Sequence, residues 1–165
     1  MNKKICMLLC MACLLFGLAM PAFGAELGEP NITAQTTMRE LRENPSIKGS
    51  GYYTYSNEWT EKDTRWMDTT IESYVGAPVA QDVVSAMNLV IENYNKGVQV
   101  TWQVYSPEKI AENVQLGMVQ LYYFPADTSN AKFAIVVPGN GGTTTSELGE
   151  GGSMAWQLHL SLIHI

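Results

Sequence analysis

The chain has 165 residues and a formal net charge of −6, with no cluster of lysine or arginine residues. This length suits one domain of ordinary size, and the acidic balance argues against a nucleic-acid-binding protein. All three cysteines, Cys6, Cys10 and Cys13, lie close to the N-terminus. Neither disulfides nor thiol chemistry is therefore expected in the rest of the chain.

Residues 1–24 have the features of a secretory signal peptide. Two lysines at positions 3 and 4 precede a nearly continuous apolar stretch, and Ala22 and Gly24 are the small residues that a signal peptidase recognises. We predict cleavage before Ala25; the alternative, an uncleaved membrane anchor, needs a longer apolar run. Cleavage leaves 8 of the 10 basic residues against 16 acidic ones, a net charge of −8. An exported chain of this kind is typical of the bacterial cell envelope or the extracellular space.

Residues 25–97 are predicted to form a helical leader region. The spacing of apolar residues predicts helices over 33–44, 64–74 and 80–96. Met38 and Leu41 are the apolar contacts of the first helix, which Pro45 ends. Residues 48–58 are expected to be extended or a loop. Gly97 stands where a left-handed residue caps a helix.

After Gly97 the apolar spacing changes to the alternation of strands. Strands are predicted at 98–105, 116–124 and 133–137. A short helix with Ser106 as its N-cap and Pro107 at its first position lies between the first two. The turn at 125–130 makes the second and third strands antiparallel neighbours. With a polar loop over 143–149 and a helix over 153–159, the order predicts an α/β protein whose open sheet has antiparallel edge strands.

Residues 160–165 read Leu-Ser-Leu-Ile-His-Ile, which is similar to the translation of a transposase adapter used in sequencing libraries. We interpret this tail as an artefact and exclude it from the fold. The alternative is a genuine apolar strand. On the first interpretation, native sequence ends at His159 and the chain is a fragment of a longer protein.

Residues 132–142 form the only stretch that indicates chemistry, an apolar run followed by a glycine-rich turn. Glycines allow backbone N–H groups to approach a ligand closely. A dinucleotide site requires a third glycine where Thr144 stands, and a phosphate loop requires Gly-Lys-Ser/Thr, which is absent. Backbone donors for a transition-state oxyanion fit better. The alternative is a tight surface turn. Glu147 and Glu150 flank the glycines and could contact a substrate amine, although solvated charges are the default interpretation.

Residues 131–159 resemble the early part of an α/β-hydrolase. The segment similar to the strand and oxyanion loop of secreted bacterial esterases and acyl-peptidase-like hydrolases is Val136-Val137-Pro138-Gly139-Asn140-Gly141-Gly142. The resemblance implies that residues 98–159 begin an incomplete α/β-hydrolase sheet, with antiparallel edge strands and the first oxyanion strand, after the helical leader. It places the oxyanion donors at Asn140, Gly141 and Gly142. Asn140 replaces a glycine of the usual triplet.

The catalytic residues of that family are not apparent in this chain. Ser153 lacks the preceding strand of a Gly-x-Ser-x-Gly elbow, so we interpret it as a helix N-cap. His159 is interpreted as an ordinary residue at the end of a helix, and His164 belongs to the suspected adapter. The resemblance therefore implies a serine, an acid and a histidine further along a longer protein, and an inactive fragment. No cofactor and no metal site are expected.

Two functions follow from these observations. The first is part of an exported serine hydrolase whose substrate is a small-molecule or peptide ester or related acyl compound, with membrane contact only through the signal peptide. The second is a non-enzymatic secreted binding domain, with the aromatic residues at 52–55 and Trp59 as its surface.

Overall fold

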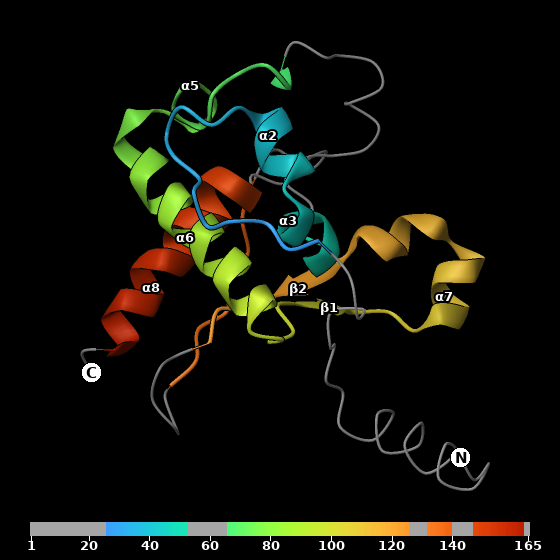
Figure 1. Cartoon of the computed structure of the whole chain (residues 1–165). Helices are drawn as coiled ribbons and strands as arrows, with labels where there is room; N and C mark the ends of the chain where they lie inside the picture. Colours follow the sequence, from blue (N-terminus) through green and yellow to red (C-terminus); the bar gives the residue numbers. More distant parts are fainter. Residues whose placement is uncertain (1–25, 53–65, 126–131, 140–146, 164–165) are drawn as a thin grey trace, which may run out of the picture.

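The computed structural model describes residues 26–52, 66–125, 132–139 and 147–163. Helix α6 (Ala77–Asn95) lies at the centre of the helical part, and α3, α5 and α8 contact it from different sides (Figure 1). The surrounding helices are α2 (Met38–Glu43), α3 (Pro45–Ser50), α5 (Ile71–Val75) and α8 (Ser153–Ile163). The mixture of helices and a small sheet confirms an α/β protein in the general sense.

The amphipathic pattern of α6 explains its central place. Of the side chains that recur at helical spacing, Tyr94 is half-buried, and the others are buried in the core: Val83, Val84, Met87, Val90 and Ile91. Pro78 lies in the first turn, where its missing N–H costs no hydrogen bond. Helix α6 therefore starts at Ala77, three residues before the predicted start at residue 80, after Gly76 with φ 89°.

The C-terminus of α6 confirms the predicted glycine cap. Gly97 has φ 79°, and its N–H donates to the Tyr94 carbonyl at 2.9 Å, while the Val98 N–H donates to the Asn93 carbonyl at 2.9 Å. These two hydrogen bonds form a Schellman motif and satisfy carbonyl groups that the helix leaves free.

Asn44 divides the predicted first helix from a helix that the sequence pattern missed. Its backbone N–H donates to the Glu40 carbonyl and ends α2, and its side chain accepts from the Ser46 and Ile47 N–H groups at 3.0 and 3.3 Å. Pro45 then occupies the first position of α3. The expectation of a loop from residue 48 was wrong for 48–50, because asparagine and proline end one helix and begin the next.

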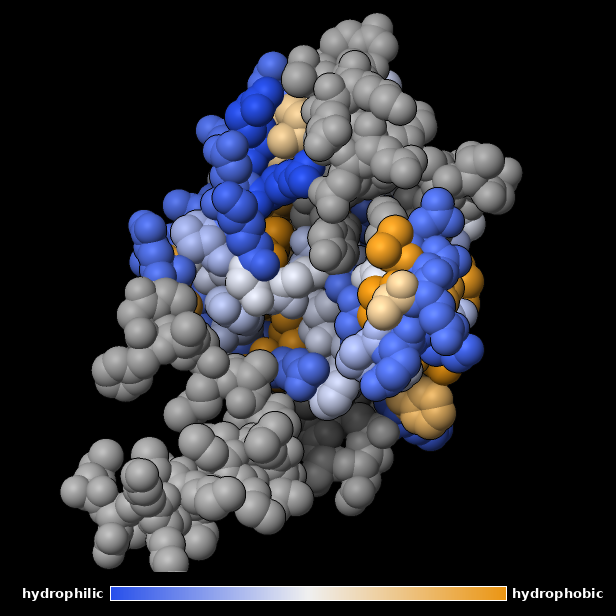
Figure 2. Space-filling model, turned by 90° about the vertical axis from the view of Figure 1, so that its right-hand side faces the viewer, coloured by the Kyte–Doolittle hydropathy of each residue, from blue (hydrophilic) through white to orange (hydrophobic). Residues whose placement is uncertain are grey.

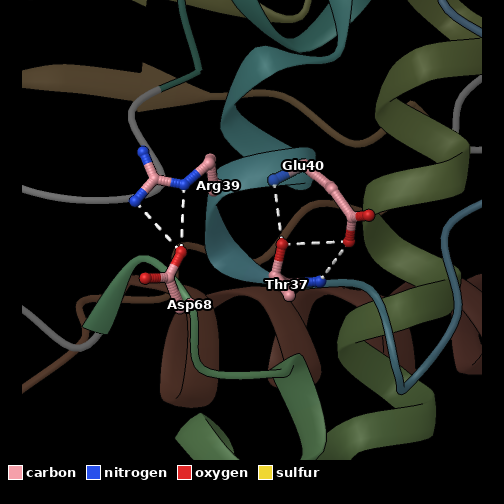
Figure 3. A network of polar contacts seen from close by, with 4 residues as sticks. All are labelled: Thr37, Arg39, Glu40 and Asp68. Atoms are coloured by element: carbon pink, nitrogen blue, oxygen red, sulfur yellow. Dashed lines mark hydrogen bonds and ion pairs between the residues drawn. The ribbon is translucent and has the colours of Figure 1, made fainter. Parts of the chain in front are cut away.

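Helix α2 begins with a capping box (Figure 3). The Thr37 hydroxyl accepts from the Glu40 N–H at 3.2 Å, and the Glu40 carboxylate accepts from the Thr37 N–H at 2.8 Å. The Thr37 backbone N–H, and then its hydroxyl, hold the pKa of Glu40 below its ordinary value. Beside the cap, Arg39 and Asp68 form an ion pair at 3.0 Å.

The predicted helix over 64–74 is shorter in the structure, where α5 starts at Ile71. The carbonyl groups of Thr69 and Met67 accept hydrogen bonds from the Met38 and Arg39 N–H groups at 2.9 and 2.8 Å. These carbonyls satisfy the free donors of α2 instead of continuing a helix of their own. A tertiary contact therefore overrides the local helical pattern.

The extended segment before α2 is tied to the helices by side-chain amides. The Asn88 amide accepts from the Ile32 N–H and donates to the Ile32 carbonyl, both at 3.0 Å. The Asn95 amide donates to the Gly28 carbonyl at 2.9 Å, and the Ser46 hydroxyl accepts from the Gly28 N–H at 2.8 Å. These bonds explain how a segment without regular structure lies firmly against the core.

Two short antiparallel strands, β1 (Thr101–Gln103) and β2 (Gln120–Tyr122), form the sheet of the described residues. Trp102 pairs with Leu121 at the centre of the register. The connection contains α7 (Pro107–Glu112) and η2 (Val114–Met118), which project away from the helices as an arm (Figure 1). Pro107 opens α7 as predicted, although the Ser106 side chain makes no capping hydrogen bond to the backbone.

The predicted third strand at 133–137 was wrong. Residues 132–139 carry no regular secondary structure, and β2 pairs with β1 instead of with them. Phe133 and Val137 are 86% and 84% exposed. The apolar alternation is that of a strand, but no ladder joins it to another described segment, and pairing is what defines a strand.

The predicted buried face of the first strand is also only partly present. Val100 is buried, whereas Trp102 and Val104 are exposed. The sheet leaves the helical core after Val100, and apolar side chains reach the surface among hydrophilic ones on the side of the arm (Figure 2).

Candidate functional site

The sequence places the candidate site in the glycine-rich turn after residue 138. The structure describes the approach to this turn through Gly139. The predicted oxyanion donors, Asn140, Gly141 and Gly142, lie outside the described residues and remain a prediction.

Gly139, the first residue of the glycine-rich turn, makes a hydrogen bond to a charged side chain. Its N–H donates to the Oε2 atom of Glu150 at 2.9 Å. A backbone amide that binds a carboxylate oxygen is a charge-assisted hydrogen bond, shorter and stronger than a bond between neutral groups. The sequence interpretation of Glu150 as a solvated charge missed this partner, because no spacing rule connects residues eleven positions apart.

Glu150 stands on a turn that is fixed to the core. The π-helical turn η3 (Glu147–Gly152) contacts α6 and continues directly into α8. Leu148 is 2% exposed, and a Cβ built on Gly152 would lie 3.9 Å from both the Met87 side chain and the Tyr52 hydroxyl. The carboxylate that reaches Gly139 therefore projects from an anchored element, although Glu150 itself is exposed.

Tyr52 lies beneath this turn and belongs to the core. It is 5% exposed, and its ring stacks on that of Tyr122 with 4.2 Å between centroids. Burial, and then the nearby charges of Tyr122 and Glu147, raise the pKa of Tyr52 well above its ordinary value. The prediction of Tyr52 as part of an aromatic binding surface was wrong, and the remaining aromatic residues of that surface, Tyr53, Tyr55 and Trp59, lie outside the described residues.

Ser153 is not the N-cap that the sequence predicted. The helical course begins six residues earlier with η3 (Glu147–Gly152), so Ser153 lies inside it. Its hydroxyl donates to the Gly149 carbonyl at 2.5 Å, and the residue is 9% exposed. A hydroxyl bonded to the preceding turn in this way is engaged by its own helix.

His159 also differs from its predicted role at the end of a helix. Helix α8 continues to Ile163, so His159 lies within it, 7% exposed and stacked on Trp156 with 5.5 Å between ring centroids. Its Nδ1 atom has no hydrogen-bond partner among the described residues. The Ser153 hydroxyl is bonded to Gly149, so no serine–histidine pair exists between these two residues.

The described parts of the chain contain no group of three or more His, Cys, Asp or Glu side chains placed to hold a metal ion. Within the same parts, none of the helices combines the length and apolar character that crossing a membrane requires.

Comparisons of the chain with protein-family models, with curated proteins and with solved structures gave no match.

Proposed function

We propose that this chain supplies the oxyanion-binding segment of an exported serine hydrolase that acts on ester or related acyl bonds. The observation that carries the proposal is the hydrogen bond from the Gly139 N–H to the Glu150 carboxylate at 2.9 Å. An exposed backbone amide at the entrance to the glycine-rich turn faces a negatively charged oxygen. Binding such an oxygen is what an oxyanion hole does when charge develops on a carbonyl in the transition state.

In this mechanism the glycine-rich turn stabilises charge and does not attack the substrate. Asn140, Gly141 and Gly142 are the proposed donors, and Gly139 fixes the start of the turn through Glu150. One donor of this kind contributes roughly 2.7–4 kcal/mol to transition-state stabilisation. The nucleophile is assigned to neither Ser153, whose hydroxyl is bonded to Gly149, nor any other residue of this chain, which is therefore proposed to be inactive alone.

The test is to express the complete exported protein and measure hydrolysis of p-nitrophenyl esters together with labelling by a fluorophosphonate. Replacing Gly141 by proline removes one backbone donor, and we expect kcat to fall about 10²–10³-fold with little change in KM. Ser153→Ala is the matched control and should keep full activity and labelling. Absence of hydrolysis and labelling in the intact protein, or loss of both in Ser153→Ala, would contradict the proposal.

A secreted binding module is the second candidate, favoured by the exposed apolar face of the sheet. Trp102, Leu121 and Tyr123 are 47%, 50% and 48% exposed, although two of them form the central cross-strand pair. Large aromatic side chains at a surface are typical of binding sites. If this function holds, Trp102→Ala abolishes binding to a partner captured from the extracellular medium, while the intact protein shows no esterase activity.

A further inference from the structure

The segment 132–139 has an unusual surface for the chain of an exported protein. Phe133, Ile135 and Val137 are 86%, 73% and 84% exposed, whereas Val136 and Pro138 between and after them are half-buried. The segment therefore rests on the molecule through Val136 and Pro138, whereas Ala134 is exposed, and it presents three large apolar side chains to water. Contiguous apolar surface of this kind marks an interaction site.

The backbone of the same segment is also without partners in the described parts of the chain. No hydrogen bond joins residues 132–138 to another described residue. An extended chain with free N–H and C=O groups is a template for pairing with another strand. The occupant of this surface, the partner that covers residues 132–138, must supply both a backbone edge and apolar side chains at alternate positions.

We propose that the occupant is a second copy of this chain, paired antiparallel about a two-fold axis at Ile135. In this register Ile135 lies opposite Ile135 of the second copy, and Phe133 lies opposite Val137. Pairs of an aromatic and a β-branched residue are among the favourable cross-strand pairs. The same patch then serves both copies, as a two-fold symmetric interface requires.

Charge supports this register over a partner of unrelated sequence. Lys132 of one copy would lie opposite Pro138 of the other, one residue from Gly139, whose N–H holds the Glu150 carboxylate at 2.9 Å. The symmetry brings each Lys132 close to the Glu150 of the other copy, so two complementary charge contacts form in a protein with a net charge of −6. Pro138 has no N–H to donate, so the ladder ends there.

Analytical ultracentrifugation of the full chain tests the dimer. We expect a concentration-dependent dimer, and Ile135→Lys should weaken it at least about tenfold because two like charges then face each other at the axis. Val114→Lys is the matched control, because Val114 is 77% exposed on the arm and its replacement should leave the dimer unchanged. A wild-type monomer, or equal sedimentation of wild type and Ile135→Lys, would overturn the proposal.

A charge change tests the register. Lys132→Glu should weaken the dimer severalfold, because two carboxylates then lie close together, and Lys132→Gln, which removes the charge without reversing it, should weaken it less. Equal association of wild type and Lys132→Glu would contradict the proposed register.

A cross-link tests the symmetry axis. In a chain with Cys6, Cys10 and Cys13 changed to serine, Ile135→Cys should form a disulfide-linked dimer, whereas Val114→Cys should not. If another segment of the same polypeptide covers residues 132–138, Ile135→Lys would lower the free energy of unfolding without changing sedimentation, and the proposal would be wrong. None of these measurements depends on hydrolase activity.

Discussion

Helix α6 and the segment 132–138 contain similar side chains in opposite surroundings. Val83 and Met87 of α6 are fully buried, whereas Phe133 and Val137 are 86% and 84% exposed. The helix satisfies its backbone internally and needs neighbours only for its apolar face, which α3, α5 and α8 supply. The extended segment needs a partner for its backbone as well as for its side chains.

This difference shows why an apolar pattern predicts a helix more securely than a strand. A helical pattern needs only a surface to pack on, and many arrangements of helices provide one. A strand needs a neighbour in register, and whether a neighbour exists is a property of the whole assembly.

The largest change in the free energy of unfolding is expected for a substitution in α6. Ile91 is fully buried, so Ile91→Ala should lower the free energy of unfolding by about 2–5 kcal/mol, from lost burial and the cavity left behind. Ile135→Ala should change that of the monomer, measured at low protein concentration, by less than about 0.5 kcal/mol, because Ile135 there faces water. Urea unfolding followed by circular dichroism measures both. Equal losses would mean that Ile135 is covered within the chain.

The contact between Gly28, in the segment before α2, and Asn44 should give the next largest change in stability. A Cβ on Gly28 would lie 2.0 Å from the Asn44 Oδ1 atom, which caps α3. Gly28→Ala should displace this amide and lower the free energy of unfolding by about 1–2 kcal/mol, the range for a lost N-cap. Gly117→Ala on the arm, where the nearest atom is 3.4 Å away, should be close to neutral. An unchanged urea midpoint for Gly28→Ala would contradict this close contact between Gly28 and Asn44.

The capping box of α2 should contribute less. Thr37→Ala should cost about 1 kcal/mol at neutral pH. Since hydrogen bonds from Thr37 lower the pKa of Glu40 in the folded state, their stabilisation is present above the ordinary value of 4.5 and is lost as the pH falls. Thr37→Ala keeps the backbone N–H from which the Glu40 carboxylate accepts, so the carboxylate is tested by Glu40→Gln: urea midpoints of wild type and Glu40→Gln should converge from neutral to acid pH, and parallel curves would show that the carboxylate is not the partner.

Ionisation of Tyr52 should leave the stability unchanged at neutral pH and should lower it increasingly as the pH becomes alkaline. Burial raises its folded-state pKa, so the unfolded chain loses this proton first and stability falls as the pH rises above about 10. Tyr52→Phe keeps the ring stack with Tyr122 and should lessen the alkaline fall. Tyr105→Phe on the arm is the control. If Tyr52→Phe and wild type lose stability equally between neutral and alkaline pH, Tyr52 is not the group responsible.

Much of the helical core was predictable from the sequence. The spacing of Val83, Met87 and Ile91 defined α6, and Gly97 defined its end, because both signals are local and depend on backbone geometry alone. Met38 and Leu41, predicted as apolar contacts, are buried in the core. The start of α5 was missed because the carbonyls of Met67 and Thr69 bind α2, a contact between segments that no local pattern reports.

The candidate site was predictable only in part. The sequence located the glycine-rich turn and resembles a hydrolase there, but it missed the Gly139 partner of Glu150 and gave Ser153 the wrong role. Both errors have the same origin: η3 begins the helical course before Ser153 and brings Glu150 to Gly139. A π-helical turn has no composition that distinguishes it from a polar loop.

The sequence by itself determined the acidic balance, the main helix with its cap, and the position of the glycine-rich turn, because each depends on residues near one another in the chain. Only the tertiary structure decided that Phe133, Ile135 and Val137 are exposed and that the first amide of the turn binds a carboxylate. Strand pairing and long-range hydrogen bonds depend on which segments meet in space. An alternating apolar pattern indicates that a segment can pair as a strand, but it does not indicate which segment is the partner.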